Sequence, residues 1–268
     1  MKTILDKITE AKRKEIAQAK REVPVEQLLN GPFYDRECIS LKNKLLKNGA
    51  SGIIAEFKRK SPSGGDINMQ TSVEEATQGY SGAGASGLSV LTDGKFFGGS
   101  LYHLAAARVA NPDMPILRKD FIIDPYQIFE AKASGADVIL LIAACLGKEE
   151  IQLLAEKAKE LHLEVLLEIH GEEELEKITP LAELIGVNNR NLKTFSVTTE
   201  TSLRLASLIP GQFVKISESG ISSPEAISRL KAAGYRGFLI GETFMRTENP
   251  GMACKNLIKR ENGEGRSS

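Results

Sequence analysis

Cysteine and histidine are scarce in this 268-residue chain, with three of each, and tryptophan is absent. The odd number and wide spacing of Cys38, Cys145 and Cys254 argue against a disulfide framework and favour a reducing, cytoplasmic compartment. No cysteine or histidine has metal-ligand spacing, so we expect no metal site. Cys145 ends an apolar run and could be a nucleophile, but its small apolar neighbours favour a packing role.

The chain also lacks net charge and long apolar segments. Lys and Arg total 35, Asp and Glu total 35, and no basic block exceeds a few residues. We therefore expect neither nucleic acid nor an anionic membrane as partner, and any bound anion must be held by local positive charge. The longest apolar runs, such as residues 138–145, are too short to span a bilayer and predict buried strands.

A strand-then-helix pattern repeats eight times after residue 51. Short Val/Ile/Leu-rich runs with little alternation, typical of parallel strands buried on both faces, cover residues 52–58, 86–92, 115–119, 137–143, 163–169, 183–188, 212–218 and 236–241. Helical patterns lie at 73–82, 100–110, 125–134, 148–161, 172–179, 198–209, 223–233 and about 250–260. The pattern predicts an α/β fold, a (β/α)8 TIM barrel. An open doubly wound sheet is the alternative, but no GxGxxG follows the first strand.

The first 45 residues form an extension before the barrel. An apolar helical stripe includes Ile4, Leu5 and Ile8, while Pro24 interrupts the segment and residues 41–46 resume a helix. The extension could be a flexible charged tail or a helical piece packed on the barrel, and the stripe favours packing. We expect one domain over 1–268: an N-terminal helical cap at 1–45, the barrel at 46–260 and a disordered tail at 261–268.

The first predicted strand ends in a carboxylate and an amine, Glu56 and Lys58, followed by Ser61 in a hydroxyl- and glycine-rich loop. Residues i and i+2 of a strand share a face, so both charges point to the carboxyl end of the strand, where α/β folds carry their chemistry. An exposed Glu/Lys ion pair is the alternative. Similar endings on other strands make that alternative the weaker one.

Several other strands deliver polar residues to the same rim, namely Lys119, Glu168, Asn188, Arg190 and Glu218. A buried ion pair for stability is the structural explanation, with Lys119 paired to Asp120 or Glu168. So many charges meeting at one rim are costly to desolvate without a charged ligand, which favours a binding site.

The ends of the last two strands predict a phosphate site. Ser219 and Gly220 open the loop before the helix at Pro224, and Gly241 and Glu242 follow the eighth strand. Loops after strands seven and eight commonly bind phosphate through backbone N–H groups and a helix N-terminus. Lys58 is a candidate for an additional positive charge.

Three motifs resemble indole-3-glycerol phosphate synthase: IAEFKRKSPSG, LRKDFIID and IGVNNRNLKTF. VLTD with FFGG, LLEIH and SESGI support the resemblance, which covers residues 50 to 245. Thr243 stands where many members have serine, which keeps a hydroxyl. The resemblance implies a carbon–carbon lyase of tryptophan biosynthesis that needs no metal or organic cofactor. It also implies that the N-terminal segment caps the barrel mouth.

The resemblance implies a role for each rim residue. Lys119 is the expected general acid, and the other acid and base lie among Glu56, Lys58 and Glu168 without further assignment. Asn188 and Arg190 are expected to position Glu56 or the substrate, and Glu218 to hold a lysine or a substrate hydroxyl. The remaining substrate-binding candidates are Ser61, Phe96 and Phe121. We expect a monomer that takes a small phosphorylated substrate.

Two other functions fit a phosphate-binding barrel. One is isomerisation of a phosphorylated aminoaldose, which favours Cys/Asp or Asp/Asp pairs where this chain has Glu and Lys. The other is a non-catalytic barrel that binds a phosphorylated metabolite, which would need lost catalytic groups. No such loss is visible in the sequence.

Overall fold

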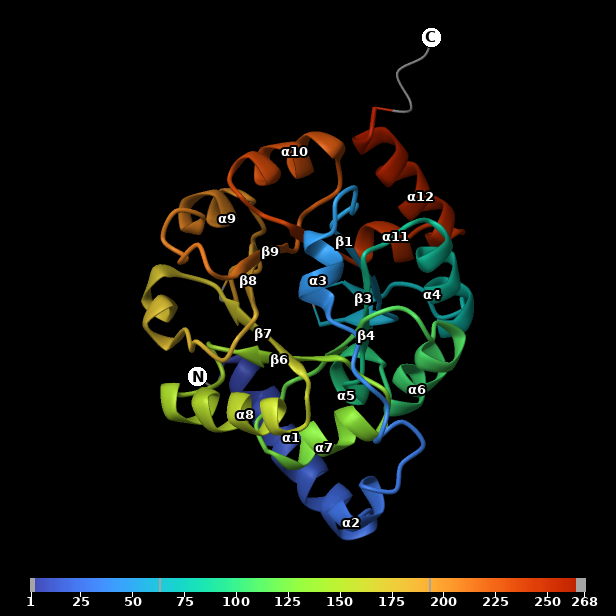
Figure 1. Cartoon of the computed structure of the whole chain (residues 1–268), viewed down its shortest axis with the longest axis vertical. Coiled ribbons are helices and arrows are strands. Elements are labelled where there is room, and N and C mark those ends of the chain that lie inside the picture. The colour runs from blue at the N-terminus through green and yellow to red at the C-terminus, as the bar shows by residue number, and fades with distance from the viewer. Residues whose placement is uncertain (1–2, 63, 193, 264–268) are drawn as a thin grey trace.

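The computed structural model describes residues 3–62, 64–192 and 194–263. Eight parallel strands close into a barrel in the order β1-β10-β9-β8-β7-β6-β5-β4 (Figure 1). The barrel strands are β1 (Ile53–Phe57), β4 (Gly87–Leu91), β5 (Ile116–Lys119), β6 (Val138–Ile142), β7 (Glu164–Ile169), β8 (Leu184–Asn188), β9 (Val214–Glu218) and β10 (Gly237–Ile240). The predicted TIM barrel is confirmed, and every predicted strand contains one of these.

Helices surround the barrel (Figure 1). They are α4 (Val73–Gly82), α6 (Leu101–Ala110), α7 (Tyr126–Ala133), α8 (Lys148–Glu160), α9 (Glu200–Leu205), α10 (Pro224–Ala232) and α12 (Pro250–Glu261). The segment predicted as a helix at 172–179 is instead a short 3₁₀ helix, η1 (Glu172–Lys177). The short elements that were not predicted include the antiparallel pair β2 (Lys60–Ser61) and β3 (Gly65–Asp66), and the single turns α5 (Gly94–Phe97) and α11 (Glu242–Met245).

Two apolar layers account for strands that are apolar on both faces. An inner cluster fills the barrel and includes Ile54, Leu117 and Leu166. An outer cluster lies between strands and helices and includes Ile53, Val165 and Ile227. Neighbouring strand residues alternate between the layers, as Ile53 and Ile54 do, so the sequence shows a continuous apolar run.

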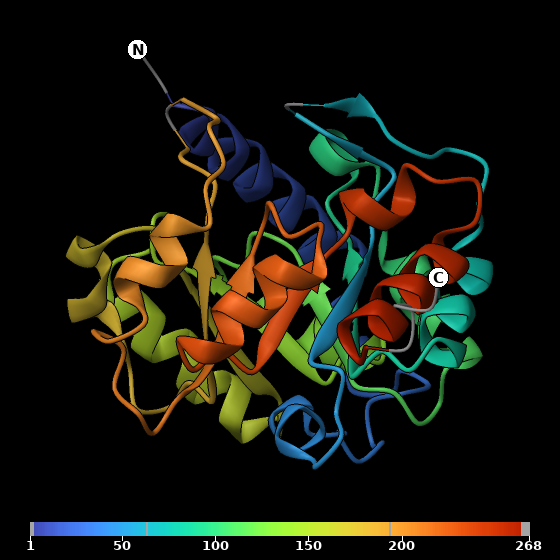
Figure 2. The ribbon, with the colours of Figure 1, turned by 90° about the horizontal axis from the view of Figure 1, so that it is seen from above.

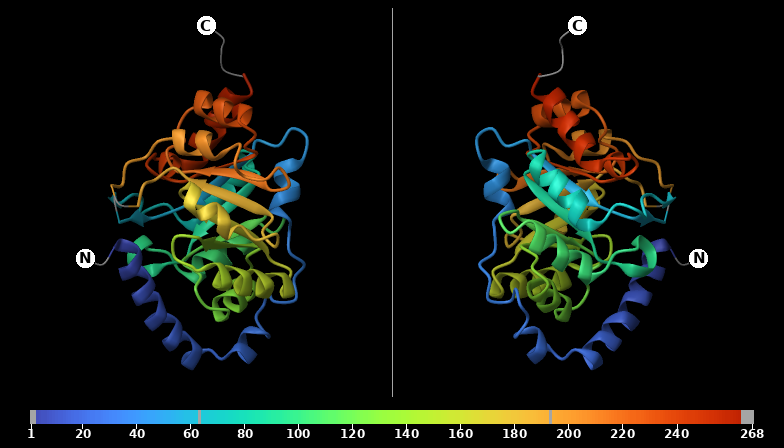
Figure 3. Two further views of the ribbon diagram at one scale, coloured as in Figure 1. Left: turned by 90° about the vertical axis from the view of Figure 1, so that its left-hand side faces the viewer. Right: turned by 90° about the vertical axis from the view of Figure 1, so that its right-hand side faces the viewer.

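Helix α3 (Leu41–Leu46) covers the amino end of the barrel, on the side opposite α1 (Figure 3). Its Leu41 and Leu45 belong to the inner cluster. A side chain at Gly87, the first residue of β4, would place its Cβ 2.5 Å from Leu41 Cδ1. That glycine therefore makes the close approach of α3 possible.

Helix α1 (Ile4–Glu22) lies at the carboxyl end of the barrel (Figure 2). Thr3 and Asp6 form a capping box at its start, which satisfies the first backbone N–H groups. At its other end the Tyr126 hydroxyl of α7 donates to the Val23 carbonyl over 2.8 Å. A single turn, α2 (Val25–Leu28), then begins the connection to α3.

A buried carboxylate, Asp137, fastens this connection to the barrel just before β6. It forms ion pairs with Arg36 from the connection and with Arg108 from α6. It also accepts 2.7 Å hydrogen bonds from the backbone N–H groups of Ile39 and Ile116. Because all these partners lose water on folding, each depends on the carboxylate.

The described helices include none that is both long and apolar enough to cross a membrane. Helix α12 ends at Glu261. Of the tail predicted to be disordered, residues 264–268 lie outside the described residues, so that expectation stays a prediction.

We expect Asp137→Asn to lower the free energy of unfolding by about 3 kcal/mol, because it leaves the buried Arg108 guanidinium without its counter-charge. Urea denaturation measures the change. The matched control is Glu200→Gln, which removes an exposed ion pair with Arg229 whose side chains are 64% and 62% accessible. The control should cost less than about 1 kcal/mol. Equal effects from the two substitutions would contradict a structural role for Asp137.

Candidate active site

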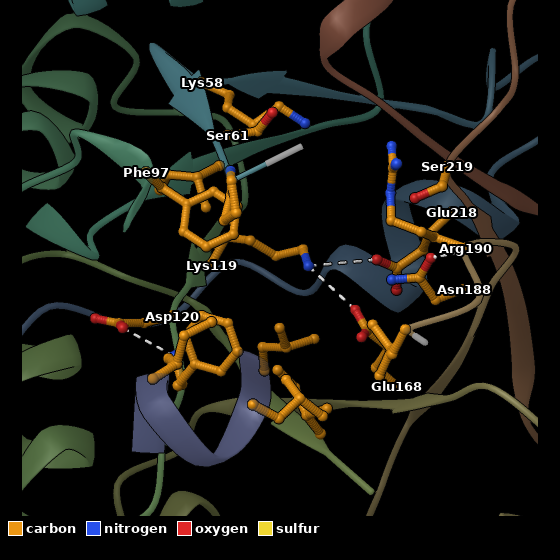
Figure 4. A pocket seen from close by; sticks show the side chains of 18 of the residues that line it. Lys58, Ser61, Phe97, Lys119, Asp120, Glu168, Asn188, Arg190, Glu218 and Ser219 are labelled. Atoms are coloured by element: carbon orange, nitrogen blue, oxygen red, sulfur yellow. Dashed lines mark hydrogen bonds and ion pairs between the residues drawn. The ribbon is translucent and has the colours of Figure 1, made fainter. Parts of the chain in front are cut away.

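A cavity opens at the carboxyl end of the barrel, between the strand ends and the first turns of α1 (Figure 4). Ile4, Leu5 and Ile8 of α1 form part of its wall. Most of the predicted site residues line it: Glu56, Lys58, Ser61, Lys119, Phe121, Glu168, Asn188, Arg190, Glu218 and Ser219. Parallel strands bring these residues together from five of the barrel strands and the loops that follow them.

Lys119 points across the cavity toward two carboxylates (Figure 4). Its Nζ lies 3.1 Å from Glu168 Oε2 and 3.6 Å from Glu218 Oε2, and its side chain is 16% accessible. Asp120, the alternative partner, points away from Lys119 (Figure 4). The ion pair expected on structural grounds is therefore the one with Glu168.

The charges of this group are coupled. Burial disfavours the Lys119 ammonium, but Glu168, Glu218 and Glu56 outweigh burial and raise the pKa of Lys119 above its usual value. Burial also disfavours the Glu168 carboxylate, yet Lys119 and His170 together lower the pKa of Glu168. At neutral pH the pair is an ammonium next to a carboxylate.

Glu218 differs from Glu168 in its environment. Burial and the neighbouring Glu168 raise the pKa of Glu218 to about 8, so its carboxyl holds a proton at neutral pH. Its Oε1 atom is buried and accepts no hydrogen bond. A Cβ at Gly186 of β8 would lie 2.2 Å from that oxygen, so this glycine provides the space for Glu218 inside the barrel.

Glu56 and Lys58 form a second pair on the β1 side of the cavity. Lys58 Nζ lies 3.2 Å from Glu56 Oε1, and the Ser89 hydroxyl donates to Glu56 Oε2 over 3.3 Å. A Cβ at Gly241 would lie 2.6 Å from Glu56 Oε1. Gly241 therefore makes room for the Glu56 side chain, a role that the phosphate hypothesis did not consider.

The aromatic wall of the cavity contains Phe97 rather than the predicted Phe96. Phe97 packs against Phe121 with ring centroids 6.0 Å apart, whereas the Phe96 ring lies beneath Lys95. Both phenylalanines belong to the single helical turn α5, in which consecutive side chains point about 100° apart. Phe97 therefore replaces Phe96 as the candidate for substrate binding.

The predicted phosphate loops lie beside the cavity. Ser219 lines it, whereas Gly220, Gly241 and Glu242 do not. Ser219 and Gly220 both have left-handed backbone, with φ of 68° and 73°, and a Cβ at Gly220 would lie 2.5 Å from Val197 Cγ1. A side chain at Gly220 would therefore be strained whether or not phosphate binds there.

Positive charge gathers around these loops. Glu242 accepts hydrogen bonds of 2.8 and 2.7 Å from Arg246. Burial opposes ionisation of Glu242, but Arg246, Lys58 and Arg190 outweigh it and lower the pKa of Glu242. Three cations around one surface carboxylate favour an additional anion. The sequence interpretation overlooked Arg246, which lies beyond the strand end.

His170 and Asn189 were also overlooked as contributors to the site. His170 lines the cavity, with Nε2 3.3 Å from Glu168 Oε1. It stands two residues after Glu168, so strand alternation could have placed it on the same side. Asn189 is buried and donates 3.0 and 3.1 Å hydrogen bonds to Ser217 and to the Ser219 carbonyl, which shapes the predicted phosphate loop.

Cys145 is not among the residues that line this cavity. Burial raises the pKa of Cys145 to about 12, so its thiol keeps its proton. Within the described ranges, no three His, Cys, Asp or Glu side chains are arranged to hold a metal ion.

Comparison with known families gives a match over most of the chain. The family model for indole-3-glycerol phosphate synthase matches residues 5–257. The indole-3-glycerol phosphate synthase of Bacteroides thetaiotaomicron is 53% identical over 97% of this chain and 99% of its own length. That of Salinibacter ruber is 44% identical over 95% of both chains.

Solved structures show the same fold at low sequence identity. The thiamine phosphate pyrophosphorylase of Pyrococcus furiosus superposes with a TM-score of 0.60 at 15% identity, covering 84% of this chain and all of that one. The 3-hexulose-6-phosphate synthase of Salmonella typhimurium gives 0.59 at 11%, covering 80% and 99%.

The raised pKa of Glu218 predicts a pH dependence of stability. Folded Glu218 keeps a proton that the unfolded chain releases near its ordinary value of 4.5, so this stabilising contribution is present below pH 4.5 and lost as pH rises toward about 8. Glu218→Gln does not titrate, so melting temperatures from pH 5 to pH 9 should show the variant gaining stability relative to the parent. Exposed Glu248→Gln is the control. A constant difference between parent and Glu218→Gln across this range would contradict the assignment.

Proposed function

The chain belongs to the indole-3-glycerol phosphate synthase family, and we propose that the cavity at the barrel mouth is where it carries out the reaction. The reaction closes the ring of 1-(2-carboxyphenylamino)-1-deoxyribulose 5-phosphate with loss of CO2 and water, in tryptophan biosynthesis. The observation that supports this assignment most is Lys119 placed between Glu168 and Glu218 in a partly apolar cavity.

Lys119 is the general acid of ring closure. As the aryl carbon attacks, negative charge develops on the ribulose-derived carbonyl oxygen, and the ammonium neutralises it and donates a proton. An alkoxide is a stronger base than an amine, so Lys119 can donate even with a raised pKa. The carboxylates keep the proton on Lys119 until the substrate oxygen competes for it.

Glu168 is the base paired with this acid. Its lowered pKa keeps it ionised at neutral pH, so it can accept a proton when the carbon skeleton loses one. Loss of CO2 restores the aromatic ring. Loss of the new hydroxyl as water then requires a second acid.

Glu56 and Lys58 together supply that second acid. Lys58 protonates the leaving hydroxyl, and the Glu56 carboxylate, 3.2 Å away, holds the Lys58 ammonium in place. Glu168 takes the one proton that the carbon skeleton loses. Lys58 and the carboxylates that Lys119 contacts lie on different sides of the cavity (Figure 4), which supports two separate proton donors.

Binding is divided among the remaining residues. Arg190 can hold the aryl carboxylate in bidentate fashion, and Asn188 supports it by accepting a 3.0 Å hydrogen bond from the Arg190 backbone. Phe97 and Phe121 enclose the aromatic ring, and Ser61 contacts a hydroxyl. The phosphate lies near Ser219, Gly220 and Gly241, with Lys58 and Arg246 as counter-charges.

The protein acts as a cytoplasmic monomer without nucleic acid. Its balanced charge, 35 basic against 35 acidic residues, supports the absence of a polyanionic partner. Three free cysteines support a reducing compartment. Helix α1 of the N-terminal segment acts as a cap over the substrate, because Ile4, Leu5 and Ile8 line the cavity. The other described residues of the predicted cap, 1–45, do not line the cavity, and α3 lies at the opposite end of the barrel.

The direct test is incubation of the purified protein with the carboxyphenylamino-deoxyribulose phosphate while indole fluorescence is followed. We expect a rise in fluorescence without added metal or organic cofactor. Substrate that stays unchanged under these conditions would refute the proposed function.

Lys119→Met separates catalysis from binding, because methionine keeps much of the apolar stem and removes the proton. A group that acts in the transition state should affect kcat more than affinity, so we expect kcat to fall at least roughly 100-fold with substrate still bound. The control is Lys231→Met, which removes an ion pair with Glu261 on the helical shell. If Lys119→Met is less stable than the parent but has the same kcat, Lys119 has only a structural role as part of an ion pair.

A further inference from the structure

Lys12 has an unusual position on α1. The buried residues of this helix are Ile8, Lys12 and Ile16, one on each successive turn, so a charged side chain stands in the middle of its buried stripe. The Lys12 side chain is 1% accessible. Burying an ammonium is costly unless its partners compensate, so the contacts of Lys12 must account for its position.

Two buried carboxylates at the barrel mouth provide those contacts. Lys12 Nζ lies 3.0 Å from Asp93 Oδ2 and 3.0 Å from Asp120 Oδ1. Glu15 of the same helix lies 2.9 Å from it but is 52% accessible. Asp93 and Asp120 follow strands β4 and β5, so the lysine joins α1 to two neighbouring strand ends.

Both carboxylates are directly connected to the substrate cavity. Asp120 follows Lys119 in the chain and lines the cavity itself. Asp93 caps α5 by accepting a 2.7 Å hydrogen bond from the Phe96 N–H, and α5 carries Phe97 of the aromatic wall. Asp120 thus connects Lys12 to Lys119, and Asp93 connects it to Phe97 in the aromatic wall.

The two carboxylates depend on Lys12 to different degrees. Asp120 also has Arg118 at 3.0 Å and the Thr92 hydroxyl at 2.6 Å. The contacts of Asp93, by contrast, are Lys12 and the Phe96 N–H. Loss of the lysine would therefore leave Asp93 as a buried carboxylate without a counter-charge.

The α8-facing side of α1 is loosely packed. A second cavity there is lined by Thr9, Arg13 and Lys20 of α1 and by Cys145 and Leu146 from the loop after β6. Ile16 of the buried stripe also borders this second cavity, so the ion pairs of Lys12 are the polar contacts that hold the stripe at the barrel mouth. The first turns of that helix supply the cavity wall of Ile4, Leu5 and Ile8.

We propose that Lys12 is a positioning residue for the reaction: its contacts with Asp93 and Asp120 hold α1 on the barrel mouth and complete the substrate cavity. This inference rests on the proposed function, because it concerns the same cavity. Substrate binds the docked form, so a smaller docked fraction raises KM in proportion. Saturating substrate restores the docked form, so kcat stays unchanged.

The test compares kcat and KM of Lys12→Met with those of the parent. Breaking a buried ion pair from one side is strongly destabilising, so we expect KM to rise at least roughly tenfold with kcat within about twofold. Lys20→Met is the matched control, on the same helix and paired at 2.8 Å with the partly exposed Asp124. It should change KM by less than about twofold.

A second variant covers the case in which Lys12→Met does not fold. Asp93→Asn keeps a side chain that can cap α5. It leaves no buried charge without a counter-charge, because Lys12 still pairs with Asp120. It removes one docking contact, so we expect KM to rise roughly threefold. In the Lys12→Met variant, Asp93→Asn removes an unpaired buried charge and should therefore lower KM. The effect of Asp93→Asn on KM is then opposite to its effect in the parent.

Each other outcome contradicts the proposal. If the parent is active and folded Lys12→Met has the same KM as the parent, Lys12 only stabilises the protein. If Lys12→Met does not fold, an unchanged KM in Asp93→Asn has the same meaning. A fall in kcat at constant KM would place its effect in the chemical step. If the effects of Lys12→Met and Asp93→Asn on KM are additive, the two residues do not act through a shared contact. An inactive parent would instead refute the proposed function.

Discussion

The attraction between the Lys119 ammonium and the carboxyl groups of Glu168 and Glu218 is the interaction on which the rest of the site depends. None of these groups is stable alone in the barrel, because each would lose its hydration without a partner. The group keeps Lys119 protonated and Glu168 ionised, while burial and Glu168 keep Glu218 neutral against the pull of Lys119. The burial of Glu218 also explains the glycine at position 186, because the Glu218 carboxyl occupies the space that a side chain there would need.

A second buried group of charges supports the first from the outside. Lys12, Asp93 and Arg118 lie behind the wall of the cavity, whereas Asp120, which is next to Lys119 in the chain, also lines it. Strand alternation explains how neighbouring residues serve both groups: Lys119 faces the cavity and Asp120 faces α1. Helix α1 and Lys119 are thereby positioned by the same few residues.

Much of this arrangement could be predicted from the sequence, because parallel strands buried on both faces leave continuous apolar runs and because residues such as Glu56 and Lys58 stand at their ends. Two things could not. Phe97 instead of Phe96 lines the cavity because a single helical turn, α5, forms in a segment without clear helical periodicity. The apolar stripe of α1 did not single out Lys12, because its burial depends on Asp93 and Asp120, which are distant in sequence.

The most direct test of the central claim is the protonation state of Lys119 in the free protein. Its side-chain nitrogen can be followed by ¹⁵N NMR, with the signal assigned by its loss in Lys119→Met. The account predicts that Lys119 remains an ammonium as pH is raised past 10.5, the ordinary lysine value, because Glu168, Glu218 and Glu56 hold its proton. Loss of that proton below pH 10.5 would show that burial outweighs the carboxylates, and would contradict the account.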